Sequence, residues 1–383
     1  MKEQRVGIIG IGAVPARSAS PEVSYREMIF EAAQKAYYEA GIEPEQVDTF
    51  VCLSEDFNEG VSIFDEYVPD QLGAVLKPVH TICGDGLYGI ASVFMQIRTG
   101  MFQIGVVEAH SKLSNIVIRG KVEEMALEPL YTRWTGLHPY FLAGLEMRRF
   151  LYETGIKEED CAEVVKRFKE NAMFNPLAAY PFKISIEDVL SSRKVATPLK
   201  ELDIAPQADG AVVVVLARED AVKSLKKDAV WIEGISFFTG EPHVDSRDFG
   251  RASYAELSTK KALEMAGIKN LRKEVSLVEI CDMFSYKALQ HIEAIGLAKK
   301  GESGILLKEG FFDFDGEIPV NLSGGHMGIG SMPEATVLYQ IFEVVKQLRG
   351  EGGTRQVKNA RVGLVQSWRG IPTSSGATLV LGV

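Results

Sequence analysis

The segment Ala32–Leu53 reads AAQKAYYEAGIEPEQVDTFVCL, and the segment Ser258–Ile280 reads STKKALEMAGIKNLRKEVSLVEI. Each is a helical apolar period that ends in Ala-Gly-Ile, followed by a short charged loop and an apolar run typical of a strand. A glycine directly after a helical period is typical of a helix C-terminus. Because the same helix–strand unit occurs twice, we expect a chain built from two similar α/β halves.

Short apolar runs alternate with helical periods in the rest of the first half as well. The alternation predicts an α/β fold with a largely parallel sheet. We expect an N-terminal half over residues 1–220 and a C-terminal half over 229–383, joined by the exposed charged segment EDAVKSLKKDA. The proline-containing stretch at about 111–202 is predicted to be an insertion in the first half, helical at Cys161–Phe174. The predicted strands are Val6–Ile11, Val47–Leu53, Val79–Ile82, Ile104–Ala109 and Ala211–Ala217, and the predicted helices are Tyr25–Ala40 and Asp85–Arg98.

Composition excludes several classes of protein. The net charge is −10 over 383 residues, so a large basic surface is missing and nucleic acid is not expected as a partner. The four cysteines have no CxxC spacing, which favours a reducing cytoplasm, and no set of His, Cys and acidic residues has zinc spacing, so we expect no metal. The longest apolar stretch, near Gly210–Ala217, is too short to span a membrane, and the N-terminal apolar run is too short for a signal peptide.

Cys83 is the candidate nucleophile. It follows the apolar run Val79–Ile82 and precedes a predicted helix, in the sequence Cys83-Gly-Asp-Gly86. The partial positive charge of a helix N-terminus favours a thiolate and can hold an oxyanion. Gly84 and Gly86 are expected to let another backbone or a thioester approach closely. The alternative is an inert buried thiol.

These motifs identify a family. The chain resembles the thiolase superfamily over nearly its whole length, most of all the archaeal and sterol-carrier-protein-type thiolases. The resemblance implies a duplicated five-layer α-β-α-β-α fold with a loop-domain insertion in the first half. It implies an acyltransferase that cleaves or forms a 3-oxoacyl-CoA through an acyl-cysteine, with coenzyme A as a substrate and no covalently bound cofactor. The motifs that carry it are CGDG (83–86), ATPLKELDIAPQADGA (196–211), VEICDMF (278–284), GLAKKGESG (296–304), VNLSGG (320–325) and SSGATLVL (374–381).

The sequence departs from this family in three loops. Cys281 begins a Cys-Asp-Met-Phe run where relatives have His or Asn, and Ser331 stands where relatives have the histidine of Gly-His-Pro. The C-terminal loop, SWRGIPTSSGA, is lengthened. We expect His326, in the same loop as Ser331, to replace the lost imidazole, and Cys281 to act as a proton-handling thiol. The alternatives are a loop histidine without a catalytic role and a small packing residue.

The resemblance also implies binding residues and partners. The backbone N–H groups of Cys83 and Gly370 are expected to hold the thioester oxygen. Arg193 and Lys183, in the insertion, are candidates for contacts with the phosphates of coenzyme A. We expect a homodimer that works with a small zinc-ribbon/OB-fold protein. The insertion's aromatic residues are expected to form either a wide acyl pocket or the core of the insertion; they are Tyr131, Trp134, Tyr140 and Phe141.

The expected function is a thiolase-type acyl-CoA C-acyltransferase, with a bulky, branched or aromatic acyl group as in benzoylsuccinyl-CoA. One alternative is a thiolase-like retro-aldolase acting on a 3-hydroxyacyl-CoA in steroid side-chain degradation, whose members use tyrosines and lack the nucleophilic cysteine. Another is a non-catalytic scaffold subunit. Cys83 in its glycine-rich setting favours the acyltransferase.

Overall fold

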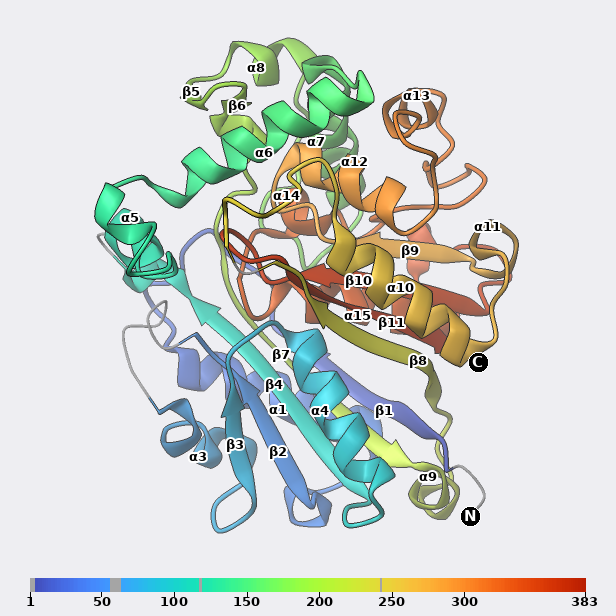
Figure 1. Cartoon of the computed structure of the whole chain (residues 1–383). Coiled ribbons are helices and arrows are strands. Elements are labelled where there is room, and N and C mark those ends of the chain that lie inside the picture. Colours follow the sequence, from blue (N-terminus) through green and yellow to red (C-terminus); the bar gives the residue numbers. More distant parts are fainter. Residues whose placement is uncertain (1–3, 56–62, 117–118, 242) are drawn as a thin grey trace.

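A computed structural model describes residues 4–55, 63–116, 119–241 and 243–383. Nine strands form one continuous mixed sheet in the order β3-β2-β4-β7-β1-β8-β11-β10-β9, and helices lie on both of its faces (Figure 1). None of the helices in these residues is long and apolar enough to span a membrane.

The first half contributes five strands of the large sheet and the second half four. The first-half strands are β1 (Val6–Ala13), β2 (Thr49–Leu53), β3 (Val79–Ile82), β4 (Ile104–Lys112) and β7 (Asp209–Arg218). Its helices outside the insertion are α1 (Tyr25–Ala40), α3 (Pro69–Leu72), α4 (Gly86–Arg98) and α9 (Glu219–Leu225). The second-half strands are β8 (Val230–Thr239), β9 (Leu277–Ile280), β10 (Val362–Trp368) and β11 (Ser375–Gly382). Its helices are α10 (Ser253–Ala266), α11 (Leu271–Glu274), α12 (Ser285–Ala294), α13 (Ser303–Lys308), α14 (Gly325–Ile329) and α15 (Thr336–Leu348).

The predicted internal repeat is confirmed. Helices α1 and α10 end at Gly41 and Gly267, which have left-handed φ angles of 67° and 72°. A residue with a Cβ atom is strained in this conformation, so glycine ends both helices. The helices lead into β2 and β9 respectively.

Three hydrophobic clusters separate the layers. In β7, Val212 and Val214 face the middle cluster, which holds α4 and α15, whereas Val213 and Val215 face the outer cluster around α1. A third cluster buries α10, α12 and the insertion against the far side of the second half. The two half-sheets meet at β1 and β8 through only two register pairs. Helix–sheet–helix–sheet–helix is therefore the layer order, as predicted.

The prediction of a largely parallel sheet is wrong. Only the pairs β2–β3, β2–β4 and β9–β10 are parallel, and the other five pairs are antiparallel. Two of the five antiparallel pairs involve β7, which enters the sheet from the insertion between β4 and β1. The other three join β1 to β8, β8 to β11, and β11 to β10, the last pair through a hairpin. The segment predicted to be an exposed joint also differs, because it forms α9 with Ala221 and Val222 buried.

The insertion packs on the second half. It contains α5 (Arg119–Glu124), α6 (Pro139–Thr154), α7 (Glu158–Ala172), α8 (Ile186–Ser191), β5 (Lys194–Ala196) and β6 (Leu199–Lys200). The predicted helix at Cys161–Phe174 is α7, which begins three residues earlier. Lys169 of α7 donates to the Met327 carbonyl at 2.8 Å, and Asn171 donates to the Asn321 carbonyl at 3.0 Å. The insertion thus fixes the loop that carries His326.

Candidate active site

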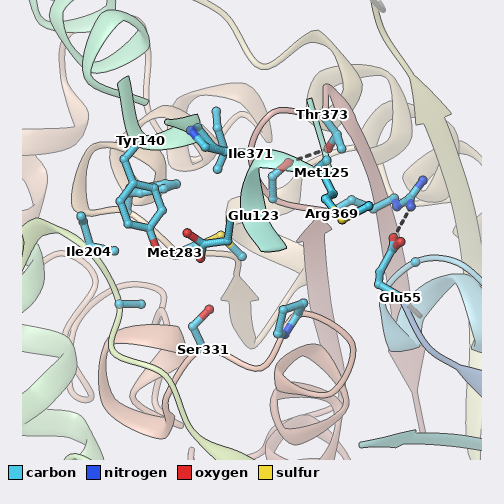
Figure 2. Close-up of a pocket in the computed structure, with 17 residues that line it drawn as sticks. Glu55, Glu123, Met125, Tyr140, Ile204, Met283, Ser331, Arg369, Ile371 and Thr373 are labelled. Carbon is cyan, nitrogen blue, oxygen red and sulfur yellow. Dashed lines mark hydrogen bonds and ion pairs between the residues drawn. The ribbon is translucent and has the colours of Figure 1, made fainter. Parts of the chain in front are cut away.

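Four motif loops meet at one cavity of about 320 Å³ (Figure 2). Gly84 comes from the loop after β3, Met283 from the loop after β9, Ser331 from the loop after α14, and Gly370 from the hairpin between β10 and β11. The insertion supplies the facing wall with Glu123, Met125 and Tyr140. Residues far apart in the sequence therefore enclose a space large enough for a small ligand.

Cys83 is exposed, and the residue that follows it, Gly84, lines this cavity. Asp85 caps α4 by accepting the Leu87 N–H at 3.0 Å, so the helix begins three residues after Cys83. The sequence predicted an earlier helix start, with Cys83 close to the free N–H groups. Cys52 and Cys161, by contrast, are fully buried, and burial raises the pKa of both thiols well above the ordinary range. Accessibility singles out Cys83.

Gly84 and Gly86, which follow Cys83, are glycines for different structural reasons. Gly84 has a φ of 155° and lines the cavity, as expected for a close approach of substrate. A Cβ atom on Gly86 would lie 2.3 Å from Leu338 Cγ, because α4 packs tightly against α15. Gly86 also donates its N–H to the Glu334 carbonyl at 2.8 Å. At Gly86 the expected close approach is therefore that of another segment of the chain, α15 and the residues before it, and not that of a thioester.

Cys281 and His326 lie together in a buried cluster. The Cys281 Sγ is 3.8 Å from His326 Nε2, and His326 Nδ1 is 3.3 Å from the Asp282 carboxylate. Asp282 also accepts the backbone N–H groups of His326 and Met327 at 2.6 and 3.1 Å. The exposed fractions of Cys281, Asp282 and His326 are 1%, 0% and 5%. The sequence predicted Cys281 and His326 but missed Asp282, which anchors the helical turn that carries the histidine.

This cluster changes the ionisation of His326. Burial alone would lower the pKa of the imidazole, but Cys281 and the Asp282 carboxylate outweigh burial and raise the pKa to about 10. His326 is therefore an imidazolium at neutral pH. Neither Cys281 nor His326 is among the described residues that line the cavity; their neighbours Met283 and Ser331 are.

A second buried network holds the backbone of Cys281. The Cys281 carbonyl faces His291 Nδ1 at 2.7 Å, and His291 Nε2 lies 2.8 Å from the Tyr254 hydroxyl. Lys287 donates to the Tyr254 oxygen at 3.2 Å and to the Glu146 carboxylate at 2.7 Å. A carbonyl only accepts, so His291 carries its proton on Nδ1 and accepts from Tyr254. Burial holds the pKa of His291 well below its ordinary value, consistent with a neutral ring.

The sequence reasoning missed this network. Lys287 and His291 are four residues apart in the predicted second half, and such spacing places them on one helix face. Their fully buried side chains contact Glu146 of the insertion and Tyr254 of α10. Only the tertiary packing brings these elements together, so the spacing of Lys287 and His291 did not reveal their partners.

The C-terminal hairpin forms another side of the cavity. Gly370 has a left-handed φ of 89°, and a Cβ atom there would lie 3.1 Å from Met283 Cε. Arg369 pairs with Glu55, and both residues line the cavity. Gly370 is thus placed next to the motif loops, as the predicted thioester contact requires.

The predicted coenzyme A contacts lie elsewhere. Arg193 is exposed and pairs with Glu201 at 3.2 Å, and Lys183 is exposed. Neither is among the described residues that line the cavity. Of the insertion's aromatic residues, Tyr140 packs edge-on against Phe284 in the cavity wall, whereas Tyr131 and Trp134 are exposed. No group of three or more His, Cys, Asp or Glu residues within the described ranges is arranged to hold a metal.

Comparison with known proteins places the chain in a family. A model described as "Thiolase C-terminal domain-like" matches residues 238–383. The chain is 32% identical to "Acetyl-CoA acetyltransferase" of Methanothermobacter thermautotrophicus over 354 residues, which cover 90% of this chain and 91% of the relative. The chain belongs to the thiolase superfamily.

Two other proteins that resemble the chain have names that point to particular reactions. The chain is 33% identical over 215 residues to "Benzoylsuccinyl-CoA thiolase subunit BbsB" of Thauera aromatica, which cover 56% of this chain and 55% of that relative. The solved structure "Ltp2-ChsH2(DUF35) aldolase" superposes with a TM-score of 0.84 at 22% identity, covering 99% of this chain and 98% of that one. A solved structure titled "Crystal structure of a monomeric SCP2-thiolase like protein type 1 (STLP1) from Mycobacterium smegmatis" superposes with a TM-score of 0.76 at 17% identity, covering 98% of this chain and 76% of that one, and confirms the thiolase fold. The family resemblance predicted from the six motifs is correct.

Proposed function

We propose that this thiolase-superfamily chain is an acyl-CoA C-acyltransferase that cleaves or forms a 3-oxoacyl-CoA through an acyl-Cys83 intermediate. The observation that carries the proposal is the convergence of Gly84, Met283, Ser331 and Gly370 on one cavity. Each comes from a loop that corresponds to a thiolase motif loop, although three of the four depart from the family in sequence. The exposure of Cys83, directly before Gly84 of the cavity wall, supports its assignment as the nucleophile.

The proposed cleavage has two acyl transfers. Cys83 sulfur bonds to C3 of the 3-oxoacyl-CoA, and the C2–C3 bond breaks, leaving its electron pair on C2, which takes a proton. The thiol of coenzyme A then attacks the acyl-cysteine and releases a new acyl-CoA, and Cys83 regains a proton. The negative oxygen that forms in each transfer requires hydrogen-bond donors, for which we propose the N–H groups of Cys83 and Gly370.

We propose that His326 and Cys281 act as one pair that exchanges the proton of the Cys83 thiol. Their separation of 3.8 Å and the Asp282 contact support this role. Because its pKa is about 10, His326 enters the reaction as a proton donor, with Cys281 as the group that exchanges a proton with it.

The acyl group is proposed to be bulky, branched or aromatic. The cavity of about 320 Å³ is lined by the side chains of Met125, Tyr140, Phe284 and Ile371, which suit an apolar group larger than acetyl. The relative named for benzoylsuccinyl-CoA adds support for an aromatic acyl group.

The assembly is proposed to be a homodimer with a small zinc-ribbon/OB-fold protein. The solved neighbour whose title names both Ltp2 and ChsH2(DUF35) supports a second subunit. Coenzyme A is proposed to bind as a substrate, with Arg193 and Lys183 as contacts for its phosphates. Both are exposed, and Arg193 would have to exchange its ion pair with Glu201 for a phosphate.

The second candidate is a retro-aldolase acting on a 3-hydroxyacyl-CoA. Two observations favour it: the aldolase likeness and the Tyr140 side chain in the cavity wall. Product analysis separates the two reactions. With a 3-oxoacyl-CoA such as benzoylacetyl-CoA plus coenzyme A, a thiolase yields two acyl-CoA products. With the matching 3-hydroxyacyl-CoA, an aldolase yields one acyl-CoA and a free aldehyde or ketone. Turnover of the 3-hydroxyacyl-CoA alone would overturn the acyltransferase proposal.

A further inference from the structure

Glu123 of α5 places a carboxylate in the same cavity as the thiolase motif loops. Figure 2 shows its carboxyl group projecting between Tyr140, Met283 and Ser331. Its side chain is 15% exposed. The insertion supplies this residue, whereas the motif loops come from the two thiolase halves.

Two side chains hold the Glu123 carboxylate in place. Tyr140 donates its hydroxyl to one oxygen at 3.1 Å, and His138 Nε2 lies 3.2 Å from the other. His138 Nδ1 accepts the backbone N–H of Tyr140 at 3.1 Å as the cap of α6. Nδ1 therefore bears no proton, so Nε2 carries the proton of the neutral ring and donates it to Glu123. The carboxylate is oriented from the rigid start of α6.

The reaction proposed above requires a proton-exchanging group that touches the substrate at C2. Such a group must come within about 3 Å of the proton that it moves, directly or through one water, which favours a group that lines the cavity. Ser331 occupies the position of the family histidine and does not titrate, and Cys281 and His326 are not among the described cavity-lining residues. Two carboxylates line the cavity within the described residues, those of Glu55 and Glu123. Glu55 forms an ion pair with Arg369, so Glu123 is the candidate.

We propose that Glu123 exchanges the C2 proton of the acyl-CoA substrate, and that Tyr140 and His138 are its positioning residues. In the condensation direction, the Glu123 carboxylate takes a proton from C2 of the second acyl-CoA. The electron pair on C2 bonds to the carbonyl carbon of acyl-Cys83, the carbon–sulfur bond breaks, and Cys83 leaves as a thiolate. The proton on Glu123 then passes to that thiolate, which restores both groups.

This inference rests on the proposed function, and two partial reactions test the inference and the proposed function separately. The first is acyl exchange between benzoyl-CoA and 3′-dephospho-coenzyme A, which needs the Cys83 thiol and no chemistry at C2. The second is exchange of the C2 hydrogens of acetyl-CoA for deuterium in D₂O, read by mass spectrometry, which needs the C2 base. Both use the protein purified with any subunit that accompanies it.

Glu123→Gln should slow C2 exchange about a hundredfold, since loss of a positioned acid–base group typically costs a factor of this order, and should leave acyl exchange within a few-fold of wild type. Glu123→Asp should retain part of the C2 exchange. Glu124→Gln is the matched control, because Glu124 lies on the same helix and pairs with Lys121. It should change neither reaction.

Three results would overturn the inference. The first is C2 exchange that survives in Glu123→Gln, and the second is equal loss of both reactions in that variant. The third is loss of C2 exchange in Cys281→Ala while Glu123→Gln retains it. A wild-type protein that catalyses neither partial reaction would overturn the proposed function together with the inference. C2 exchange lost in Glu123→Gln from a protein that shows no acyl exchange would support Glu123 while rejecting the acyl-Cys83 intermediate.

Discussion

Cys83 and Cys281 lie in two loops of the same active-site region, and they have opposite surroundings. Cys83 is exposed on a loop whose position is set by the close packing of Gly86 against Leu338. Cys281 is 1% exposed and lies beside His326. Access and an imidazole partner are both features of reactive cysteines; Cys83 has the access, and Cys281 has an imidazole within 3.8 Å. We assign acyl transfer to the accessible thiol, and exchange of that thiol's proton to the buried one together with His326.

The largest effect is expected from Cys83→Ala. Removing a covalent nucleophile should lower turnover of a 3-oxoacyl-CoA by on the order of 10⁴-fold or more, with the fold intact because the side chain is exposed. Steady-state thiolysis monitored by the release of acyl-CoA products measures it. Cys52→Ala is the matched control. The folded fraction of this variant should retain turnover. Near-normal thiolysis by Cys83→Ala would reverse the assignment of the two thiols.

The network behind Cys281 should respond strongly to loss of a charge. Lys287 and Glu146 are fully or almost fully buried, so Lys287→Met leaves a buried carboxylate without its cation and should lower the free energy of unfolding by about 3–5 kcal/mol. Urea unfolding measures the change. The double variant Glu146→Gln/Lys287→Met removes both charges and should recover much of the loss. If the double variant is no more stable than Lys287→Met, the ion pair is not what stabilises this region.

His326 should affect both rate and the pH dependence of stability. We expect His326→Ala to lower thiolysis by about 10²-fold, the lower end of the range for a group that handles a proton. Its folded-state pKa of about 10 exceeds the ordinary histidine value, so its contribution to stability is fully present below about pH 6.5 and is lost as the pH rises toward 10.

The stability difference between wild type and His326→Ala tests the ionisation directly. Urea unfolding at several pH values should show the difference shrinking from pH 6 toward pH 10. Asp282→Asn, which removes one source of the raised pKa, should flatten the same profile. A difference that grows with pH would mean that the folded protein holds His326 neutral.

The smallest effect is expected at the loop that carries Cys83. A Cβ atom in Gly86→Ala would lie 2.3 Å from Leu338 Cγ, and overpacking of this kind costs about 1–3 kcal/mol. Thermal or urea unfolding measures the cost. Leu338→Ala in the same chain makes room for the methyl group, so the two substitutions should be less than additive. Additive losses would show that α4 and α15 do not constrain each other at this contact.

The sequence predicted those parts of the fold that local patterns determine. The helix–strand repeat, the ends of α1 and α10, and the strand–turn–helix setting of Cys83 all depend on residues close in the chain. The sheet direction was predicted wrongly, in part because β7 returns from a long insertion whose exit direction no local pattern records.

The site was predictable only in part for the same reason. Cys281 and His326 were found because both depart from family motifs, and their proximity follows from the adjacent ends of β9 and the VNLSGG loop. Lys287, Glu146 and Glu123 were missed because their partners lie on other elements. Burial of a lysine or placement of a glutamate in a cavity depends on packing between the insertion and the second half, which spacing does not encode.

The assignment of acyl transfer to Cys83 rather than Cys281 can be measured by trapping the acyl group. The protein is mixed with benzoyl-CoA, quenched in acid, digested and examined by peptide mass spectrometry. We predict a benzoyl adduct on the peptide that contains Cys83, no adduct on the peptide that contains Cys281, and loss of the adduct in Cys83→Ala. A benzoyl group on Cys281, or no benzoyl group on Cys83 in a protein that turns over a 3-oxoacyl-CoA, would contradict the acyl-Cys83 mechanism.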